Sequence, residues 1–297
     1  MKILTDKLQE ARKRTDEAFL KSFPDLILEE TEVYEAAKYS FIGGGKALRP
    51  FLVFTISDLL GLDLKCATQI ALAVESVHAY SLIHDDLPAM DNDTLRRGKP
   101  TCHIQFSEAT AILTGDALLT KAFEVLSDEK THPDAIIRCQ LISLLSKCAG
   151  INGMIGGQLI DLKGETKELS SQEIYLMQKL KTGALLKFSC IAPAVAANKS
   201  PDIINKLEKY AQLIGILFQI TDDILDAVGD EKIVGKTLQK DKNANKSNFV
   251  TLFGKDNALE KAKLIHNEAI SLLKDTPLLS KNNLLETLTN FILVREY

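Results

Sequence analysis

Residues 81–103 read SLIHDDLPAMDNDTLRRGKPTCH, and this stretch decides how the chain is organised. It contains four aspartates followed directly by three cations: Asp85, Asp86, Asp91, Asp93, Arg96, Arg97 and Lys99. Carboxylate oxygens are the ligands that Mg2+ prefers, and such ions are usually shared with the phosphate oxygens of a substrate. Guanidinium groups bind further phosphate oxygens in bidentate geometry. This order of charges indicates a metal and phosphate site, although a solvated charged segment at a helix end would have the same composition.

A second acidic cluster lies far downstream, where Asp222, Asp223 and Asp226 follow Gln219 in an apolar run from Leu213 to Leu225. Charges are costly in such a run and are not expected there without a function. On a helix, Asp222 and Asp226 would share one face. Clustered aspartates repel one another unless cations neutralise them. The two clusters together therefore predict metal ions bound between them.

These clusters resemble the aspartate-rich motifs of the trans-type polyprenyl diphosphate synthases, most closely the bacterial short-chain farnesyl diphosphate synthases. The family's first motif, DDxxxxD followed by LRRG, matches Asp85–Asp91 and Leu95–Gly98, and its second motif, DDxxD, matches Asp222–Asp226. The resemblance covers nearly the whole chain. It implies an all-α fold, in which residues 1–297 form a single domain, an antiparallel helical bundle around a deep central cavity.

The resemblance also implies an activity, the condensation of isopentenyl diphosphate with dimethylallyl and geranyl diphosphate to (2E,6E)-farnesyl diphosphate. Three Mg2+ ions, which Mn2+ can replace, would be bound by Asp85, Asp86, Asp91, Asp222, Asp223 and Asp226. The allylic diphosphate would be bound by Arg96, Lys181, Thr182, Gln219 and Lys236, of which the first four are the expected catalytic residues. Isopentenyl diphosphate would be bound by Lys46, Arg49, His78 and Arg97.

Two glycine-rich segments match further motifs of the family. The first, GGGKALRP at 43–50, interrupts regular structure, and its glycines allow the backbone to approach a bulky group closely. Ala47 stands where the family usually has arginine. The second, Gly156-Gly157-Gln158 with Asp161, resembles GGQxxD, and its two polar side chains are expected to support ligands rather than to be ligands. Without the resemblance, the first segment would read as an ordinary interhelical turn.

Three further motifs of the family match this sequence, two in predicted helices and one in a polar stretch. Glu75 and His78 match the family's ExxH, and Lys181-Thr182-Gly183 matches its KT motif, at which a helix bends. The polar stretch between Val228 and Phe249 is expected to be a long functional loop. It carries Lys236, Asp241 and Lys246 of the family's GKxxGxDxxxxK pattern, with Lys240 in place of a glycine.

Residues 68–84 are apolar on nearly every face, which predicts a helix surrounded by protein. Pro88 cannot continue that helix and is expected to turn Asp91 back toward the site. Tyr80 lies five residues before Asp85, roughly 7 Å deeper along the helix. A ring at that depth would form the floor under a growing product. Tyr80 and Ser81 are therefore the expected chain-length positions. The resemblance implies a fifteen-carbon product, because this position is aromatic in family members that stop at that length.

The remaining apolar residues also follow a helical period. Leu4, Ala11 and Phe19 predict an amphipathic helix that ends before Pro24, and the segment from Phe51 to Leu60 predicts another. Two or three amphipathic helices are expected from residue 252 onward. No strand-like alternation occurs in the sequence.

Composition excludes several classes of function. The net charge of -4 and the pI near 5.8 argue against a nucleic-acid-binding surface. Five cysteines without CxxC pairing indicate neither a disulfide framework nor a zinc site. The sequence has no signal-peptide core and no apolar run of about 18 residues. We therefore expect a cytoplasmic protein without stable membrane insertion, and the resemblance implies a homodimer.

Several other functions compete with this interpretation. A geranylgeranyl diphosphate synthase differs only in product length. The doublet His84-Asp85 in a helical chain also occurs in metal-dependent phosphohydrolases of the HD type, and a terpene cyclase would share one aspartate-rich motif. The non-enzymatic alternative is a helical interaction scaffold with acidic faces.

Overall fold

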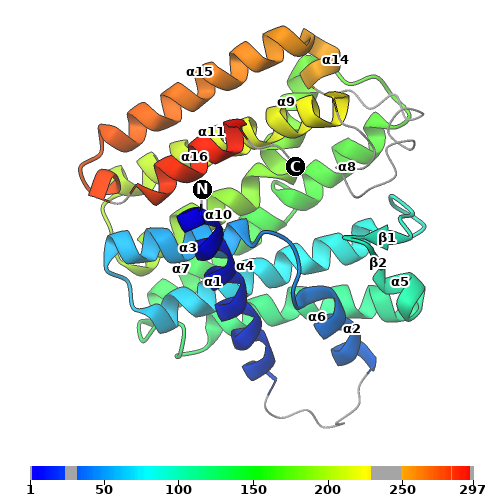
Figure 1. The fold of residues 1–297 in the computed structure, drawn as a ribbon. Helices are drawn as coiled ribbons and strands as arrows, with labels where there is room; N and C mark the ends of the chain where they lie inside the picture. The colour runs from blue at the N-terminus through cyan, green and yellow to red at the C-terminus, as the bar shows by residue number, and fades with distance from the viewer. Residues whose placement is uncertain (1, 24–31, 229–248, 282, 295–297) are drawn as a thin grey trace. The chain divides into compact units, whose positions relative to one another are not determined.

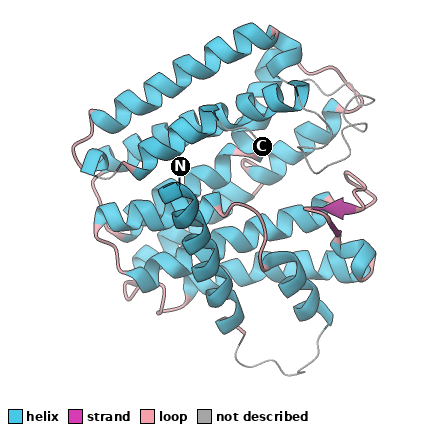
Figure 2. Cartoon of the chain, in the orientation of Figure 1, coloured by secondary structure: helices cyan, strands magenta, loops and turns pink. Residues whose placement is uncertain are grey.

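The segments in which apolar residues recur at helical spacing are helices in the structure. It is a computed structural model and describes residues 2–23, 32–228, 249–281 and 283–294. Its helices are α1 (Lys2–Lys21), α2 (Glu32–Phe41), α3 (Leu48–Leu60), α4 (Leu64–Asp85), α5 (Cys102–Gln105), α6 (Glu108–Ser127), α7 (Ala135–Ala149), α8 (Met154–Gly164), α9 (Ser171–Lys181), α10 (Gly183–Ala196), α11 (Pro201–Val228), α14 (Phe249–Phe253), α15 (Lys255–Lys274) and α16 (Leu284–Val294), with a 3-10 turn at Leu279–Lys281. The described residues hold one β-hairpin, β1 (Leu95–Arg96) and β2 (Lys99–Pro100), which Figure 2 shows among the helices. The all-α prediction is confirmed, whereas the hairpin was not expected.

The described residues form two compact units. The first comprises Lys2–Ser143 and Val195–Ala197, and the second comprises Leu144–Ala194 and the chain from Asn198 onward. The prediction of a single domain around a central cavity stays a prediction.

Helix α4 is the centre of the first unit. It begins at Asp63, whose side chain accepts hydrogen bonds from the backbone N–H groups of Lys65 and Cys66, as an N-cap should. Residues on all of its sides are buried, including the continuous stretch from Ile70 to Val77. It packs most extensively against α6, which lies beside it in Figure 1, and also against α1, α2 and α3. This arrangement confirms the predicted helix surrounded by protein.

Helix α11 organises the second unit. It packs against α9, α14, α15 and α16 (Figure 1). The hydroxyl of Tyr210, at the centre of this packing, contacts the carbonyl oxygen of Leu285 and Oγ1 of Thr289, each at 3.1 Å. These contacts join α11 to α16 through a fully buried side chain. The C-terminal helices confirm the prediction of amphipathic helices after residue 252.

Two tyrosines of this unit differ in whether their hydroxyl has a partner among the described residues, and they give a stability prediction. Tyr210→Phe removes the hydrogen bonds that the hydroxyl forms with Leu285 and Thr289, and it should lower the free energy of unfolding by about 1 kcal/mol. Tyr175→Phe removes a buried hydroxyl without a partner among the described residues, so it should leave stability unchanged or raise it. Thermal unfolding of the two variants measures the difference, and equal midpoints would contradict the role of Tyr210.

Candidate active site

The first acidic motif lies where α4 ends. Asp85 is the last helical residue, and the backbone N–H of Asp91 donates to the carbonyl oxygen of Asp85 at 2.9 Å. The segment after Pro88 therefore returns to the end of the helix, as the sequence predicted. Both side chains are half-buried, and Oδ1 of Asp91 is buried without a hydrogen-bond partner among the described residues. A buried carboxylate oxygen in this state can coordinate a cation.

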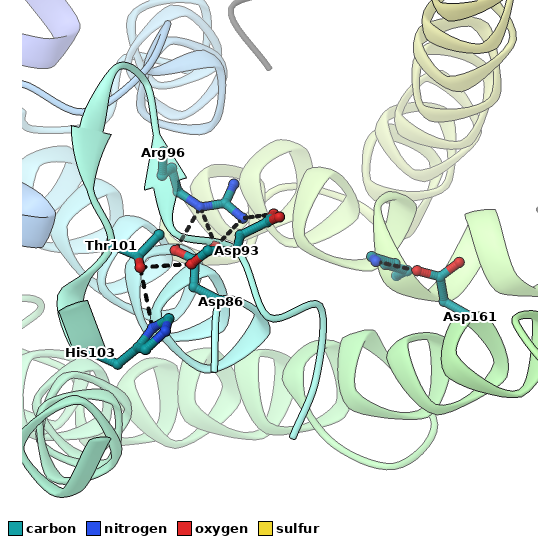
Figure 3. A network of polar contacts seen from close by, with 7 residues as sticks. Asp86, Asp93, Arg96, Thr101, His103 and Asp161 are labelled. Carbon is teal, nitrogen blue, oxygen red and sulfur yellow. Dashed lines mark hydrogen bonds and ion pairs between the residues drawn. The ribbon is translucent and has the colours of Figure 1, made fainter. Parts of the chain in front are cut away.

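Asp86, the neighbour of Asp85, has a different environment. Its carboxylate is 4% exposed and is bound by Arg96, with Nε at 2.8 Å from both oxygens and Nη2 at 2.5 Å from Oδ1 (Figure 3). Burial opposes the charge of Arg96, but the hydrogen bond and the charge of Asp86 raise its pKa. The predicted metal ligand Asp86 and the predicted phosphate ligand Arg96 are thus paired with each other. Asp86 orients the guanidinium group of Arg96 in this structure.

The hairpin that follows places the next arginine. Arg97 and Gly98 form its two-residue turn with φ angles of 55° and 76°, since Arg96 pairs with Lys99 across the strands. Positive φ at both positions is the geometry of a type I′ turn, which glycine and asparagine favour and arginine does not. Thr101 closes the hairpin, because its hydroxyl donates to the carbonyl oxygen of Asp93 at 2.7 Å (Figure 3).

The guanidinium group of Arg97 lies directly against the first glycine-rich segment. A Cβ atom on Gly44 would overlap Nη1 of Arg97, and a Cβ on Gly45 would lie 2.6 Å from Nη2. The expected close approach to a bulky group is confirmed, and the group is Arg97. Ala47 is buried and adopts φ 49° as the residue before α3, so an arginine at this position would have to be accommodated in a buried site.

Four arginines lie close enough to His78 to act on its charge. Burial lowers the pKa of His78, and the charges of Arg49, Arg97, Arg96 and Arg12 lower it further, which keeps the imidazole neutral at physiological pH. Burial also lowers the pKa of Arg49, whose Nε atom is buried without a hydrogen-bond partner in the described part of the chain. This environment suits an anion with several oxygens. Lys46, the fourth residue predicted to bind isopentenyl diphosphate, is exposed.

In the second unit, the predicted lysine is held by a predicted supporting residue. Nζ of Lys181 donates to Oδ2 of Asp161 at 2.5 Å (Figure 3). Gly157 makes this pairing possible, because a Cβ there would overlap the backbone N of Lys181 and lie 2.7 Å from its Cα. The glycine in α8 therefore lets the end of α9 pass at close range. Gln158 is also buried, and its Nε2 atom has no hydrogen-bond partner among the described residues, so its supporting role stays a prediction.

The second acidic motif is linked to the break between α9 and α10. The hydroxyl of Thr182, at this break, lies 3.5 Å from Oε1 of Gln219. The amide of Gln219 donates to Oδ1 of Asp223 at 2.8 Å, and the backbone N–H of Phe249 donates to Oδ2 at 2.8 Å. Asp223 is 4% exposed, whereas Asp222 is half-buried. Each acidic doublet thus has one anchored member and one more accessible member.

Some predicted residues are described only in part. Lys236, Lys240, Asp241 and Lys246 lie outside the described residues. The backbone of Asp226 continues α11, but its side chain lies outside the described part. Within the described ranges, no three His, Cys, Asp or Glu side chains are close enough to hold a metal ion by themselves.

Tyr80 lies in the first unit with its ring edge-on to His84, at a centroid distance of 5.1 Å. Its side chain is buried, and burial together with the nearby carboxylates Asp85 and Asp116 raises the pKa of its hydroxyl. Nε2 of His84 lies 3.0 Å from the carbonyl oxygen of Ile112 in α6. Tyr80 is therefore held close to the acidic motif by packing between α4 and α6, and Ser81 beside it is half-buried.

Comparisons with known proteins agree with these motifs. A sequence profile of the family described as Polyprenyl synthetase matches residues 30–288. The chain belongs to the polyprenyl synthetase family. It is 40% identical to the farnesyl diphosphate synthase of Haemophilus influenzae over 98% of both chains, and 41% identical to that of Escherichia coli over 97% of both chains. A solved structure of an FPP/GFPP synthase from Zymomonas mobilis has a TM-score of 0.88 and 38% identity, covering 98% of this chain and 99% of that chain.

Family membership places the observed contacts in context. Some of the residues that the sequence singled out lie at helix ends, in glycine-rich segments or in the hairpin turn, whereas His78 lies within α4 and Gln219 and Asp222 lie within α11. One buried arginine beside them, Arg12 in α1, has no motif to mark it, because it is one charged residue of an ordinary amphipathic helix. No helix among the described residues could span a membrane.

The contact at Gly157 predicts a specific sensitivity in this polyprenyl synthetase. Gly157→Ala should force α8 and α9 apart at Lys181 and destabilise the fold by about 1–3 kcal/mol, the usual cost of overpacking. Gly183→Ala is the matched control, since its nearest neighbour, the carbonyl oxygen of Gln178, would lie 3.5 Å from the added Cβ. Thermal unfolding distinguishes the two, and equal midpoints would contradict the close approach.

Proposed function

We propose that this chain condenses isopentenyl diphosphate with dimethylallyl and geranyl diphosphate to give (2E,6E)-farnesyl diphosphate. The observation that carries this proposal is the turn after α4, which returns the backbone of Asp91 to Asp85, leaves Oδ1 of Asp91 buried without a hydrogen-bond partner among the described residues, and is followed by the two arginines of the hairpin. A metal and a diphosphate need this combination of acceptors and donors. The names of relatives that match over nearly the full chain support the same reaction.

Mg2+ fits the oxygen donors of both acidic motifs. We assign its binding to Asp85 and Asp91 from the first motif and Asp222 from the second, with three ions in total. Asp86 and Asp223 act differently, because their oxygens are hydrogen-bonded within the protein, so they hold Arg96 and Gln219 in place. The bound metal supplies Lewis-acid stabilisation of the departing diphosphate.

The remaining residues act on the two substrates. Arg96 and Lys181, oriented by Asp86 and Asp161, bind the allylic diphosphate as its C–O bond breaks and the bonding electrons leave with it. Lys236 would assist them. Oxygens of Thr182 and Gln219 stabilise the allylic cation. The double bond of isopentenyl diphosphate, bound by Lys46, Arg49, His78 and Arg97, attacks the cation, and the departing diphosphate accepts the proton that is then lost.

We also propose that the protein is a homodimer and that it is located in the cytoplasm. The exposure of three large apolar side chains on α5 and α6, Ile104, Ile112 and Leu113, supports the homodimer, since a second copy of this chain could cover them. All five cysteines are free, which fits a reducing cytoplasm.

The first test measures the reaction itself. Purified protein with labelled isopentenyl diphosphate and geranyl diphosphate should form a fifteen-carbon product in the presence of Mg2+, and chelation with EDTA should abolish it. Asp91→Asn should lower kcat/KM by about a hundredfold or more, since it removes a metal-binding charge. A twenty-carbon product would favour geranylgeranyl synthesis, a cyclic hydrocarbon a terpene cyclase, and inorganic phosphate without chain growth a phosphohydrolase. Activity of none of these kinds would favour the scaffold.

The second test concerns product length. Tyr80→Ala should open the floor of the pocket and shift products beyond fifteen carbons, whereas Tyr80→Phe keeps the ring and should keep the product length. Chromatographic sizing of the products compares the two variants. Unchanged length in Tyr80→Ala would remove the chain-length role of this residue.

A further inference from the structure

A buried arginine on the first helix joins three segments of the first unit. Nη1 of Arg12 donates to Oε1 of Glu75 at 2.7 Å and to the carbonyl oxygen of Gly44 at 3.0 Å. The guanidinium group also lies over the ring of Phe41, 5.1 Å from its centroid. The side chains of Arg12 and Glu75 are only 11% and 7% exposed. This is therefore a buried charged network and not a surface ion pair.

Asp16, one helical turn after Arg12, completes the network. It forms an ion pair with Arg12, and its Oδ2 accepts a hydrogen bond from the backbone N–H of Gly43 at 3.1 Å. The two side chains thus hold consecutive residues of the glycine-rich segment from the same face of α1. The segment needs such support, because Gly43 and Gly45 have φ angles of 68° and 60° and form no regular structure.

The residues predicted to bind isopentenyl diphosphate all adjoin these contacts. Lys46 and Arg49 follow directly after the supported glycines, and Arg97 lies against Gly44 and Gly45. His78 is one helical turn after Glu75 on α4. A single guanidinium group therefore fixes the glycine-rich segment relative to the helix that carries the histidine.

The network also balances charge. Glu75 is a carboxylate close enough to Arg49 and Arg97 to favour their charged forms. An uncompensated carboxylate at this place would compete with an incoming diphosphate for the same cations. Arg12 neutralises Glu75 and leaves the other two arginines to the ligand.

We propose that Arg12, together with Asp16, is a positioning residue for the homoallylic diphosphate site, because it holds the glycine-rich segment on α4 and compensates Glu75. Arg12 acts through Gly44 and Glu75 and does not itself contact substrate. This inference rests on the proposed function, since it assigns support to the site that would bind isopentenyl diphosphate.

The test compares affinities for the two substrates. Arg12→Met should raise the KM for isopentenyl diphosphate, and its Kd by calorimetry in the absence of the allylic substrate, about tenfold or more. The KM for geranyl diphosphate should stay within about twofold, because Arg12 is bonded to Gly44 and Glu75, whereas Arg96, which is proposed to bind the allylic diphosphate, is held by Asp86. A general loss of folding would change both constants.

Two further variants separate positioning from stability. Arg12→Met alone leaves Glu75 buried without its cation, so its thermal midpoint should fall. The double variant Arg12→Met/Glu75→Gln removes that charge and should recover the midpoint, but only part of the affinity for isopentenyl diphosphate, because the contact with the carbonyl oxygen of Gly44 stays lost. Arg14→Met is the matched control, since Arg14 lies on the same helix and forms a more exposed ion pair with Glu10 at 2.7 Å. It should change neither constant.

The outcomes are distinguishable. If the wild-type protein binds no isopentenyl diphosphate, the proposed function fails. If the wild-type protein binds it and Arg12→Met binds it equally well, only the positioning role is overturned. Full recovery of affinity in the double variant would also overturn that role, because the contact with the carbonyl oxygen of Gly44 would then be dispensable.

Discussion

Carboxylates packed against apolar helices must be compensated, and this constraint determines both acidic motifs. Two adjacent aspartates repel each other and lose hydration, so a protein donor has to bind at least one of them. In the first motif Arg96 binds Asp86, and in the second Gln219 and the backbone of Phe249 bind Asp223. In both motifs, the second aspartate of the doublet is bound by protein donors. The anchored aspartate fixes a neighbouring element, and the first aspartate of each doublet stays more accessible.

Several of these features were predictable from the sequence because they depend on local chemistry. A run of apolar residues without a polar face predicted the buried helix α4, and Pro88 predicted where it would end. The glycine-rich segment at 43–50 was correctly predicted as a place of close approach, whereas the close approach at Gly157 was not predicted. Their partners, Arg97 for Gly44 and Lys181 for Gly157, could be found only in the structure, because the contacts join segments far apart in the chain.

Other features left no pattern that sequence reasoning could detect. Two residues per strand are too few to alternate, so the hairpin at Leu95–Pro100 was missed, and the only signal for it was the glycine after Arg97. The role of Asp86 depends on a partner ten residues away across the turn. Arg12 contacts Glu75, 63 residues later, and the spacing of charges on an amphipathic helix does not identify such a partner.

The turn at Arg97 connects backbone strain to the chemistry of the site. A residue with a Cβ atom in the left-handed region costs roughly 1 kcal/mol relative to glycine, and asparagine would be tolerated there more easily. Arg97 has a φ angle of 55°, so the turn is less favourable than it would be with glycine or asparagine at this position. Strain of this kind persists where the surrounding structure fixes it and the side chain has a use. The guanidinium group lies against Gly44 and Gly45, two glycines that could not carry a side chain without displacing it. The strained turn and the two glycines thus act together, because both are needed to place the guanidinium group of Arg97. There its charge acts on Arg49 and His78, at the site proposed for the homoallylic diphosphate.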